Sequence, residues 1–182
     1  MAVQPLLVNA AELLRRPGTQ KSYTLEVALA DLDIVDDPRF APDARVEVQL
    51  DLESLSTGIV VDGEVRVPWH GTCRRCLEPT GGVSVSEVHE LYQRTLTDPD
   101  AFEIVGDQLD LLPIARELVL LDAPSTPLCR PDCAGLCPTC GANLNGNDNE
   151  GACNCTATPA DPRWSALDSL KSVLDPDDRP GR

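Results

Sequence analysis

Eight cysteines stand in short pairs, and this pairing constrains the fold more than any other feature of the 182-residue sequence. The stretch Cys137-Pro-Thr-Cys140-Gly141 has the spacing of a turn that points two thiolates at one tetrahedral metal ion. Two residues between the thiols let the backbone curl, so that nearby N–H groups can donate to the sulfurs. The spacing therefore predicts zinc binding. The candidate ligands are Cys73, Cys76, Cys129, Cys133, Cys137, Cys140, Cys153 and Cys155.

Eight thiols are enough for two closed sites of four thiolates each. One partition groups the last four cysteines into a tail site, with residues 141–151 as a flexible connector, and pairs Cys73 and Cys76 with Cys129 and Cys133. In a second partition Cys133 replaces a member of the tail site, and Cys129 completes a three-cysteine site with His70. The spacing leaves both partitions open.

Disulfide formation and thiol redox chemistry are the alternatives to metal binding for these cysteines. Disulfides need an oxidising compartment, but the N-terminus has neither the basic segment nor the apolar run of a signal peptide. We therefore expect a cytoplasmic protein with reduced thiols. Arg74 and Arg75 would favour a redox-active thiolate in the first pair, but a turn rather than a helix is predicted after Cys76. A thiol redox or zinc-sensing protein remains the alternative function.

The charge of the chain limits the class of partner. Its 30 acidic and 15 basic residues give a formal net charge of −15. A nucleic-acid-binding protein normally presents a basic face, so RNA would be repelled at long range, and a basic protein partner such as a ribosomal protein fits better. Arg74, Arg75 and Arg130 are local exceptions. Aromatic residues make up only 3%, too few for a stacking platform, and no apolar run reaches the length of a membrane span.

Alternating apolar residues predict strands around Tyr23–Leu29, Val46–Leu52 and residues 81–92. Asp62-Gly63 between two apolar runs predicts a β-hairpin turn. The first cysteine pair then lies at the turn between two antiparallel strands. The predicted fold class is α+β, with an antiparallel β-rich core (a small barrel or sandwich), a few helices and a zinc-stapled C-terminal loop.

Three helices are predicted from capping signals and apolar runs. One begins at Asn9 and ends before Pro17-Gly18, a second spans residues 111–121, and a third begins at Asp161-Pro162 and extends to residue 174. The predicted domains are a β-rich core over residues 1–122, a cysteine-rich zinc-binding module with the last helix over 123–174, and a disordered tail over 175–182.

Four motifs occur in an order that resembles a known family. They are Cys73-Arg-Arg-Cys76-Leu-Glu-Pro79, Leu128 to Leu144 with its four cysteines, Cys153-Asn-Cys155 and Asp161-Pro-Arg-Trp164. Together they resemble the cysteine-rich zinc-binding branch of the YceD family, the large ribosomal RNA subunit accumulation proteins. The resemblance implies a cytoplasmic metal-binding factor in ribosome biogenesis that supports accumulation or processing of large-subunit ribosomal RNA. It also implies nucleic-acid binding, with ribosomal RNA or a pre-ribosomal particle as partner, reached directly or through a basic ribosomal protein.

Catalysis is not expected. The chain has two histidines and lacks the nucleophile-elbow, phosphate-loop and dinucleotide-binding motifs. A catalytic zinc site keeps one coordination position open, whereas sites made only of cysteine are closed. The sequence therefore predicts no catalytic residues, no small-molecule substrate and no membrane partner.

Overall fold

The computed structural model describes residues 6–146, 153–155 and 162–167. The chain divides into two compact units, residues 1–132 and 133–182. The first contains every described β-strand and the one described α-helix, and the second contains Cys133 and the tail cysteines. The prediction of a separate module beginning at residue 123 stays a prediction.

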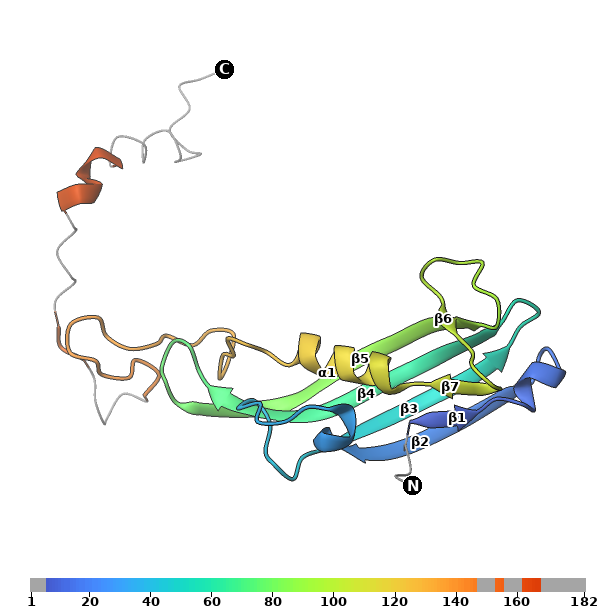
Figure 1. Cartoon of the computed structure of the whole chain (residues 1–182). Helices are drawn as coiled ribbons and strands as arrows, with labels where there is room; N and C mark the ends of the chain where they lie inside the picture. Colours follow the sequence, from blue (N-terminus) through green and yellow to red (C-terminus); the bar gives the residue numbers. More distant parts are fainter. Residues whose placement is uncertain (1–5, 147–152, 156–161, 168–182) are drawn as a thin grey trace, which may run out of the picture. The chain divides into compact units, whose positions relative to one another are not determined.

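The first unit is built on an open five-stranded sheet (Figure 1). Its strand order is β2-β3-β4-β5-β6; β2 to β5 pair antiparallel, and β6 joins β5 in parallel. The strands are β2 (Gln20–Ala28), β3 (Arg45–Ser54), β4 (Ile59–Thr72), β5 (Pro79–Gln93) and β6 (Phe102–Glu103). A second, two-stranded sheet pairs β1 (Leu7–Asn9) with β7 (Gln108–Asp110). The predicted α+β class with an antiparallel β-rich core is confirmed, and in the described residues the sheet is not closed into a barrel.

Strict alternation of apolar and polar residues along the strands explains why one face of the sheet is buried. In β3 the side chains of Val46, Val48, Leu50 and Leu52 are all buried, while those between them are exposed or half-buried. Because successive side chains of a strand point to opposite faces, this pattern directs one face to the core and the other to solvent.

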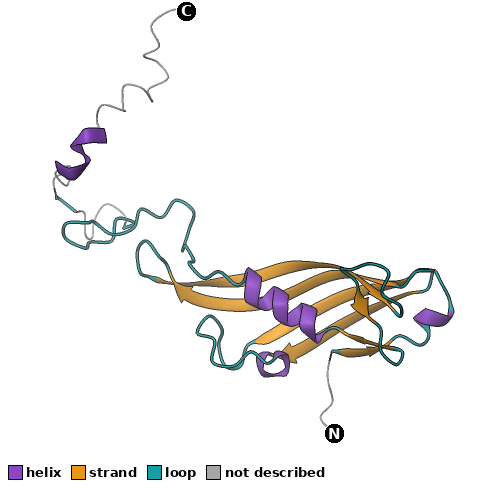
Figure 2. Cartoon of the chain, turned by 45° about the horizontal axis from the view of Figure 1, so that its top comes forward, coloured by secondary structure: helices purple, strands orange, loops and turns teal. Residues whose placement is uncertain are grey.

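The helix α1 (Leu112–Asp122) lies across the buried face of the sheet (Figure 2). Pro113 stands in its first turn, where the missing N–H costs no hydrogen bond. Ile114, Ala115 and Val119 are buried and belong to the same apolar core as the inner side chains of β3 and β4. Burial of this stripe holds the helix to the sheet, since an isolated helix of this length is marginal in water.

The predicted hairpin at Asp62-Gly63 is wrong. β4 runs without interruption from Ile59 to Thr72, and Gly63 pairs with Leu50 in its middle. Gly63 has φ 150°, and a Cβ atom there would lie 2.0 Å from the carbonyl oxygen of Gln49. The glycine permits a close approach of two strand backbones rather than a turn.

The helix predicted from Asn9 is reduced to a 3₁₀ turn over Leu13–Arg15. Asn9 belongs to β1, and its side-chain oxygen accepts a hydrogen bond from the N–H of Ala11 at 3.0 Å. Pairing of β1 with β7 fixes the chain in an extended form up to the start of the predicted helix. Of the third predicted helix, the structure describes a 3₁₀ helix over Pro162–Leu167; residues 168–174 and the predicted disordered tail lie outside the described residues.

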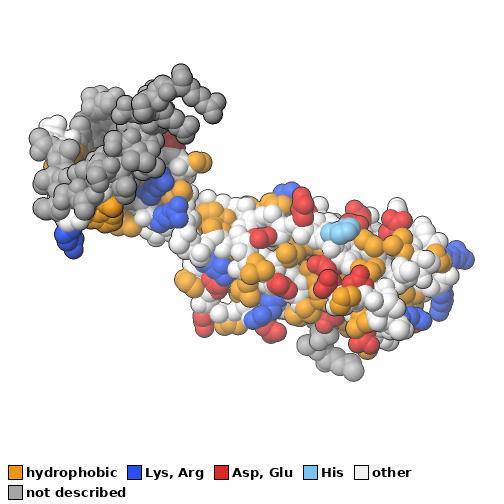
Figure 3. Space-filling view, turned by 90° about the horizontal axis from the view of Figure 1, so that it is seen from above, with side chains coloured by type: hydrophobic (Ala, Val, Ile, Leu, Met, Phe, Trp, Pro, Cys, Tyr) orange, Lys and Arg blue, Asp and Glu red, His pale blue; other side chains and the backbone are white. Residues whose placement is uncertain are grey.

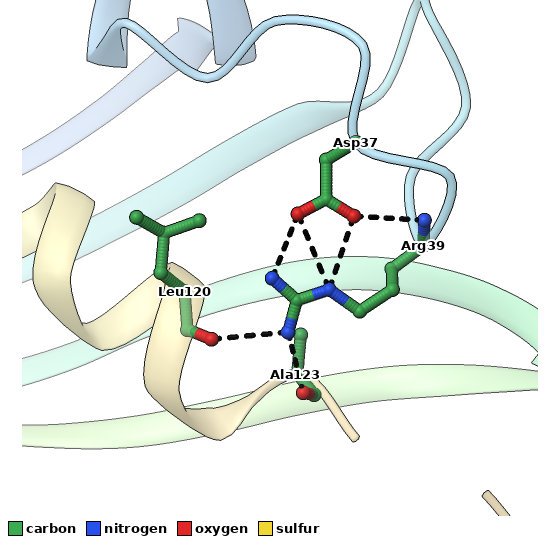
Figure 4. A network of polar contacts seen from close by, with 4 residues as sticks. All are labelled: Asp37, Arg39, Leu120 and Ala123. Carbon is green, nitrogen blue, oxygen red and sulfur yellow. Dashed lines mark hydrogen bonds and ion pairs between the residues drawn. The ribbon is translucent and has the colours of Figure 1, made fainter. Parts of the chain in front are cut away.

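A single arginine ties the end of α1 to the loop before β3 (Figure 4). The Arg39 guanidinium donates to the carbonyl oxygens of Leu120 at 3.0 Å and Ala123 at 2.8 Å, and it forms a forked ion pair with Asp37. The hydrogen bonds from Arg39 to Asp37 hold the pKa of the Asp37 carboxyl below its usual value. The Arg39 carbonyl in turn accepts from the N–H of His70 in β4 at 2.8 Å. Arg39 thus joins loop, helix and sheet.

Replacing Arg39 tests this connection. Arg39→Ala should lower the free energy of unfolding by about 1.5–3 kcal/mol, because it removes charged hydrogen bonds and leaves the end of the helix without its donor. Arg39→Lys should lose most of the same stability, since an ammonium group cannot reproduce the fork. Urea denaturation measures both. Arg66→Ala is the matched control: it removes the more exposed pair with Glu64 and should change stability little. Equal effects of R39A and R66A would contradict the assignment.

Candidate metal centres

The first cysteine pair forms the turn of the β4–β5 hairpin. The strand register ends at the pair Thr72–Pro79, so residues 73–78 make the connection. The N–H of Cys73 donates to the carbonyl of Glu78 at 2.8 Å, and the N–H of Leu77 donates to the carbonyl of Cys73 at 2.9 Å. Leu77 has φ 61°, in the left-handed region. The prediction that this pair lies between two antiparallel strands is confirmed.

The second pair repeats this backbone geometry. The N–H of Cys137 donates to the carbonyl of Ala142 at 2.8 Å, and the N–H of Gly141 donates to the carbonyl of Cys137 at 2.9 Å. Gly141 has φ 73° and stands where Leu77 stands in the first turn. The same tight turn is therefore formed twice, once with the glycine that a left-handed position favours and once without it.

The eight thiols gather in two groups of four. Within each group the sulfur atoms lie within 4.8 Å of one another, and all eight cysteines are free thiols. This is the grouping of the first partition, and His70 is in neither group. The groups are Cys73, Cys76, Cys129 and Cys133, and Cys137, Cys140, Cys153 and Cys155.

The sulfur spacing suits a tetrahedral ion. Four sulfurs held about 2.3 Å from a central zinc would stand about 3.8 Å apart. The Sγ atoms of Cys76 and Cys129 are 3.6 Å apart, and that of Cys153 lies 3.5 Å from Cys140 and 3.1 Å from Cys137. Each group could hold a metal ion with this donor set.

The segment after α1 brings Cys129 to the first turn. The N–H of Arg74 donates to the carbonyl of Pro127 at 2.9 Å, and the Arg75 guanidinium reaches the carbonyl of Pro131 at 3.4 Å. Both contacts use main-chain carbonyls of the segment that carries Cys129. Arg74 and Arg75 therefore position the chain at this group, a role that the sequence did not indicate.

An asparagine that the sequence analysis missed supports the thiols. The Asn145 amide donates to the Sγ of Cys133 at 3.3 Å, and its oxygen accepts from the N–H of Ala134 at 2.8 Å. A hydrogen bond from Leu144 N–H to the carbonyl of Gly135, at 2.8 Å, closes the same loop. The predicted flexible connector is therefore held by hydrogen bonds over residues 141–146; residues 147–152 lie outside the described residues. The only signal for Asn145 was its place just after the cysteine run.

Backbone donors favour ionisation of one thiol in each turn. A hydrogen bond from the backbone of Cys76 lowers the pKa of Cys73 to about 6. The backbone of Cys140 does the same for Cys137, with help from the Cys153 thiol, and its pKa is also about 6. Hydrogen bonding to neighbouring thiols raises the pKa of Cys155 to about 12. Thiolates are the form that binds metal, so each turn supplies one ligand already ionised at neutral pH.

The fold and these thiols define a class: a sheet-based protein with two four-cysteine centres able to hold metal. Residues 61–171 match the family model described as large ribosomal RNA subunit accumulation protein YceD. The matched range covers more than half of the chain and contains all eight cysteines. The chain belongs to the YceD family.

Its relatives fall into two groups. An uncharacterised protein of Mycobacterium tuberculosis is 32% identical over 173 residues, which cover 90% of this chain and 80% of the relative. The chloroplastic large ribosomal RNA subunit accumulation protein YCED homolog 1 of Arabidopsis thaliana is 25% identical over 175 residues, covering 78% of this chain and 52% of the relative. The homologue of the same name in Zea mays is 33% identical over 73 residues, 40% of this chain and 22% of the relative. No solved structure matches the chain.

The family description names a factor in accumulation of ribosomal RNA rather than a catalyst. Among the helices that the structure describes, none has the length and apolar character to cross a bilayer.

Thiol titration tests the two turns. In reduced, metal-free protein, two thiols should ionise near pH 6, well below the value of about 8.5 for an ordinary cysteine. Ultraviolet absorbance of the thiolate should therefore rise by two thiolates between about pH 5 and about pH 7.5. Cys73→Ser and Cys137→Ser should each remove one of them, and Cys155→Ser, the control, should remove none. A titration with no step below about pH 8 would contradict the role of the backbone donors.

Proposed function

We propose that this protein is a zinc-binding, non-enzymatic factor in ribosome biogenesis that acts in the cytoplasm and supports accumulation or processing of large-subunit ribosomal RNA. The observation that carries the proposal is the match of residues 61–171 to the large ribosomal RNA subunit accumulation proteins, since this range includes both thiol groups. The name of the Arabidopsis relative, at 25% identity, supports the same role.

Zinc is the metal that best suits the donors. Four thiolates in tetrahedral reach are typical of structural zinc, and closed sites of this kind stabilise a fold rather than catalyse a reaction. All eight cysteines are the proposed ligands, four to each ion. Bound zinc would neutralise much of the thiolate charge and hold the cysteine-bearing loops in place.

The outer face of the sheet supports a basic partner. The strand register sets acidic residues directly opposite each other three times, in the pairs Glu26–Glu47, Asp51–Asp62 and Glu64–Glu87. Directly opposed like charges destabilise a sheet. Arg66 pairs with Glu64 and His89 with Asp62 within the chain, and a cationic partner would relieve the repulsion that remains. In the view of Figure 3, acidic side chains are spread over one side of the first unit, with basic and apolar side chains among them. A basic ribosomal protein fits the outer face of the sheet, and through it the protein would reach a pre-ribosomal particle.

A thiol redox or zinc-sensing protein is the second candidate. The low pKa of Cys73 and Cys137 favours it, because thiolates are the form that oxidants attack. The two functions differ in metal retention. Under mild peroxide a structural site keeps its zinc, whereas a sensor releases it and forms disulfides. Zinc release that thioredoxin or another dithiol reductant reverses would favour the sensor.

Zinc content tests the ligand assignment. Purified protein should contain about two zinc ions per chain. Cys137→Ser/Cys140→Ser should lower the content to about one, and His70→Ala, the control, should leave it unchanged. Because a structural zinc ion contributes on the order of 10 kcal/mol to a small metal module, chelation should expose residues 129–155 to protease before the sheet is cleaved. About one zinc ion in the unsubstituted protein, or protease resistance unchanged by chelator, would contradict the two-site assignment.

The cellular role has its own test. Deletion of the gene should lower mature large-subunit ribosomal RNA relative to the small-subunit species, measured on total RNA. Cys73→Ser/Cys76→Ser should reproduce the loss, because these cysteines form the turn of the longest hairpin. Cys153→Ser/Cys155→Ser should mainly lower protein abundance, which an immunoblot separates from a specific defect. A deletion strain with a normal subunit ratio in both cold and warm growth would refute the ribosomal role and favour the redox candidate.

A further inference from the structure

The free side of β2 is an open strand edge. In the part of the chain that the structure describes, β2 ends the five-stranded sheet and has a strand neighbour, β3, on one side only. The N–H of Ser54 in β3 donates to the carbonyl of Thr19 at 2.9 Å. In an antiparallel ladder, hydrogen-bonded pairs recur at every second residue, so residues 21, 23, 25 and 27 bond to β3. The N–H and C=O groups of Ser22, Thr24 and Glu26 therefore point away from the sheet.

The next residue in this outward series confirms the assignment. The N–H of Ala28 donates not to β3 but to the Asp31 carboxylate, at 3.2 Å. The backbone N–H at the C-terminal end of the free edge therefore has a hydrogen-bond acceptor within the chain. The three residues before it offer donors and acceptors in strand spacing along the outside of the sheet.

A groove of about 680 Å³ runs beside this edge. One wall is formed by the core-side residues Tyr23 and Leu25 of β2, and the other by Leu7 and Val8 of β1. Figure 1 shows β1 lying alongside β2, although β1 pairs with β7 rather than with β2. Tyr23 and Leu25 are half-buried against the core and keep an apolar surface facing the groove. The groove thus lies on the core side of the open strand edge and has an apolar lining.

One end of the groove is basic, in contrast to the net charge of −15. Arg15, Arg16 and Lys21 line it together with one acid, Glu12, which pairs with Lys21 at 3.0 Å. The N–H of Thr19 donates to the carbonyl of Arg16 at 3.2 Å, which places the arginines at the N-terminal end of β2. Both arginine side chains are exposed and available to carboxylates of a ligand.

We propose that this groove binds an extended peptide of a partner protein as an added strand on β2, with acidic residues at the C-terminal end of the peptide. An added strand would take up the free N–H and C=O groups of Ser22, Thr24 and Glu26, and its alternate apolar side chains would cover Tyr23 and Leu25. An antiparallel strand ends where β2 begins, so its last residues meet Arg15 and Arg16.

The strand edge favours a peptide over RNA as the occupant. A phosphate backbone could use the cations, but it has no match for backbone donors and acceptors in strand spacing. The described groove contains one aromatic ring, Tyr23, too little for base stacking. One end of this groove is basic, whereas the outer face of the sheet is acidic. The groove therefore takes a different ligand from the basic partner proposed above.

Amide hydrogen exchange in the full-length, zinc-loaded protein tests the proposal. In the free protein the amides of Ser22, Thr24 and Glu26 should exchange faster than those of Tyr23 and Leu25. The probe is an eight-residue peptide of alternating valine and threonine that ends in two aspartates; the same peptide ending in two lysines is its control. The acidic peptide should slow exchange at the three outward amides by at least about tenfold and leave the other two unchanged.

Two variants separate strand addition from simple charge attraction. Thr24→Pro removes one outward N–H without removing a bond to β3, and it should weaken binding of the acidic peptide about tenfold. Thr24→Ala, its matched control, keeps the N–H and should bind normally. Arg15→Glu/Arg16→Glu changes two exposed side chains and should abolish the preference for the acidic peptide.

Three results would overturn the proposal. The first is exchange protection without the every-second-residue pattern. The second is equal binding of the acidic and basic peptides, and the third is a twelve-nucleotide RNA that displaces the acidic peptide and protects the same groove. Thermal unfolding of each variant confirms that it is folded, and if Thr24→Pro is not, the arginine variant and the exchange pattern still decide.

Discussion

The turn at Cys73–Cys76 constrains both the sheet and the metal chemistry, because it closes the hairpin of the two longest strands. The register of β4 and β5 runs from Ile59–Tyr92 to Thr72–Pro79. A slip of one residue would turn every side chain of a strand to the opposite face. The hydrogen bonds within the turn therefore fix which side chains of β5 face the core. The same bonds aim two sulfurs at one point, so sheet register and thiol geometry have a common origin.

Packing of the apolar core brings segments that are distant in the sequence close to that turn. α1 lies on the buried face of β4 and β5, and Arg39 fastens its C-terminal end. The chain leaves the helix next to the hairpin, where main-chain carbonyls at Pro127 and Pro131 accept hydrogen bonds from Arg74 and Arg75. Cys129 is placed by these contacts and not by its distance along the chain from Cys76. The position of the first thiol group therefore depends on α1 and on the contacts of Arg39 with the end of α1.

Charge is distributed unevenly over this framework. The outer sheet face opposes carboxylates at a cost in stability, while the groove beside β2 gathers exposed arginines. Opposed carboxylates lower the stability of a sheet, and an uncovered strand edge invites pairing with another chain. Two surfaces of opposite charge match the two different ligands proposed above, a basic protein and an acidic peptide.

Local patterns in the sequence determined the elements whose causes are local. Alternation in Val46–Leu52 gave β3, Pro113 marked the start of α1, and cysteine spacing gave the tight turns, since each depends on neighbours a few residues away. Only the tertiary structure decided the rest. The local sequence predicts a turn at Gly63, but the close approach of the β3 backbone places this glycine within a continuous strand. The local sequence predicts a helix cap at Asn9, but pairing of β1 with β7 places this residue in a strand. Three features join segments that are far apart in the sequence: the grouping of the thiols, the hydrogen bonds from Asn145 and the groove beside β2. A local sequence pattern does not specify which distant segments will be in contact, so these features could not be predicted from it.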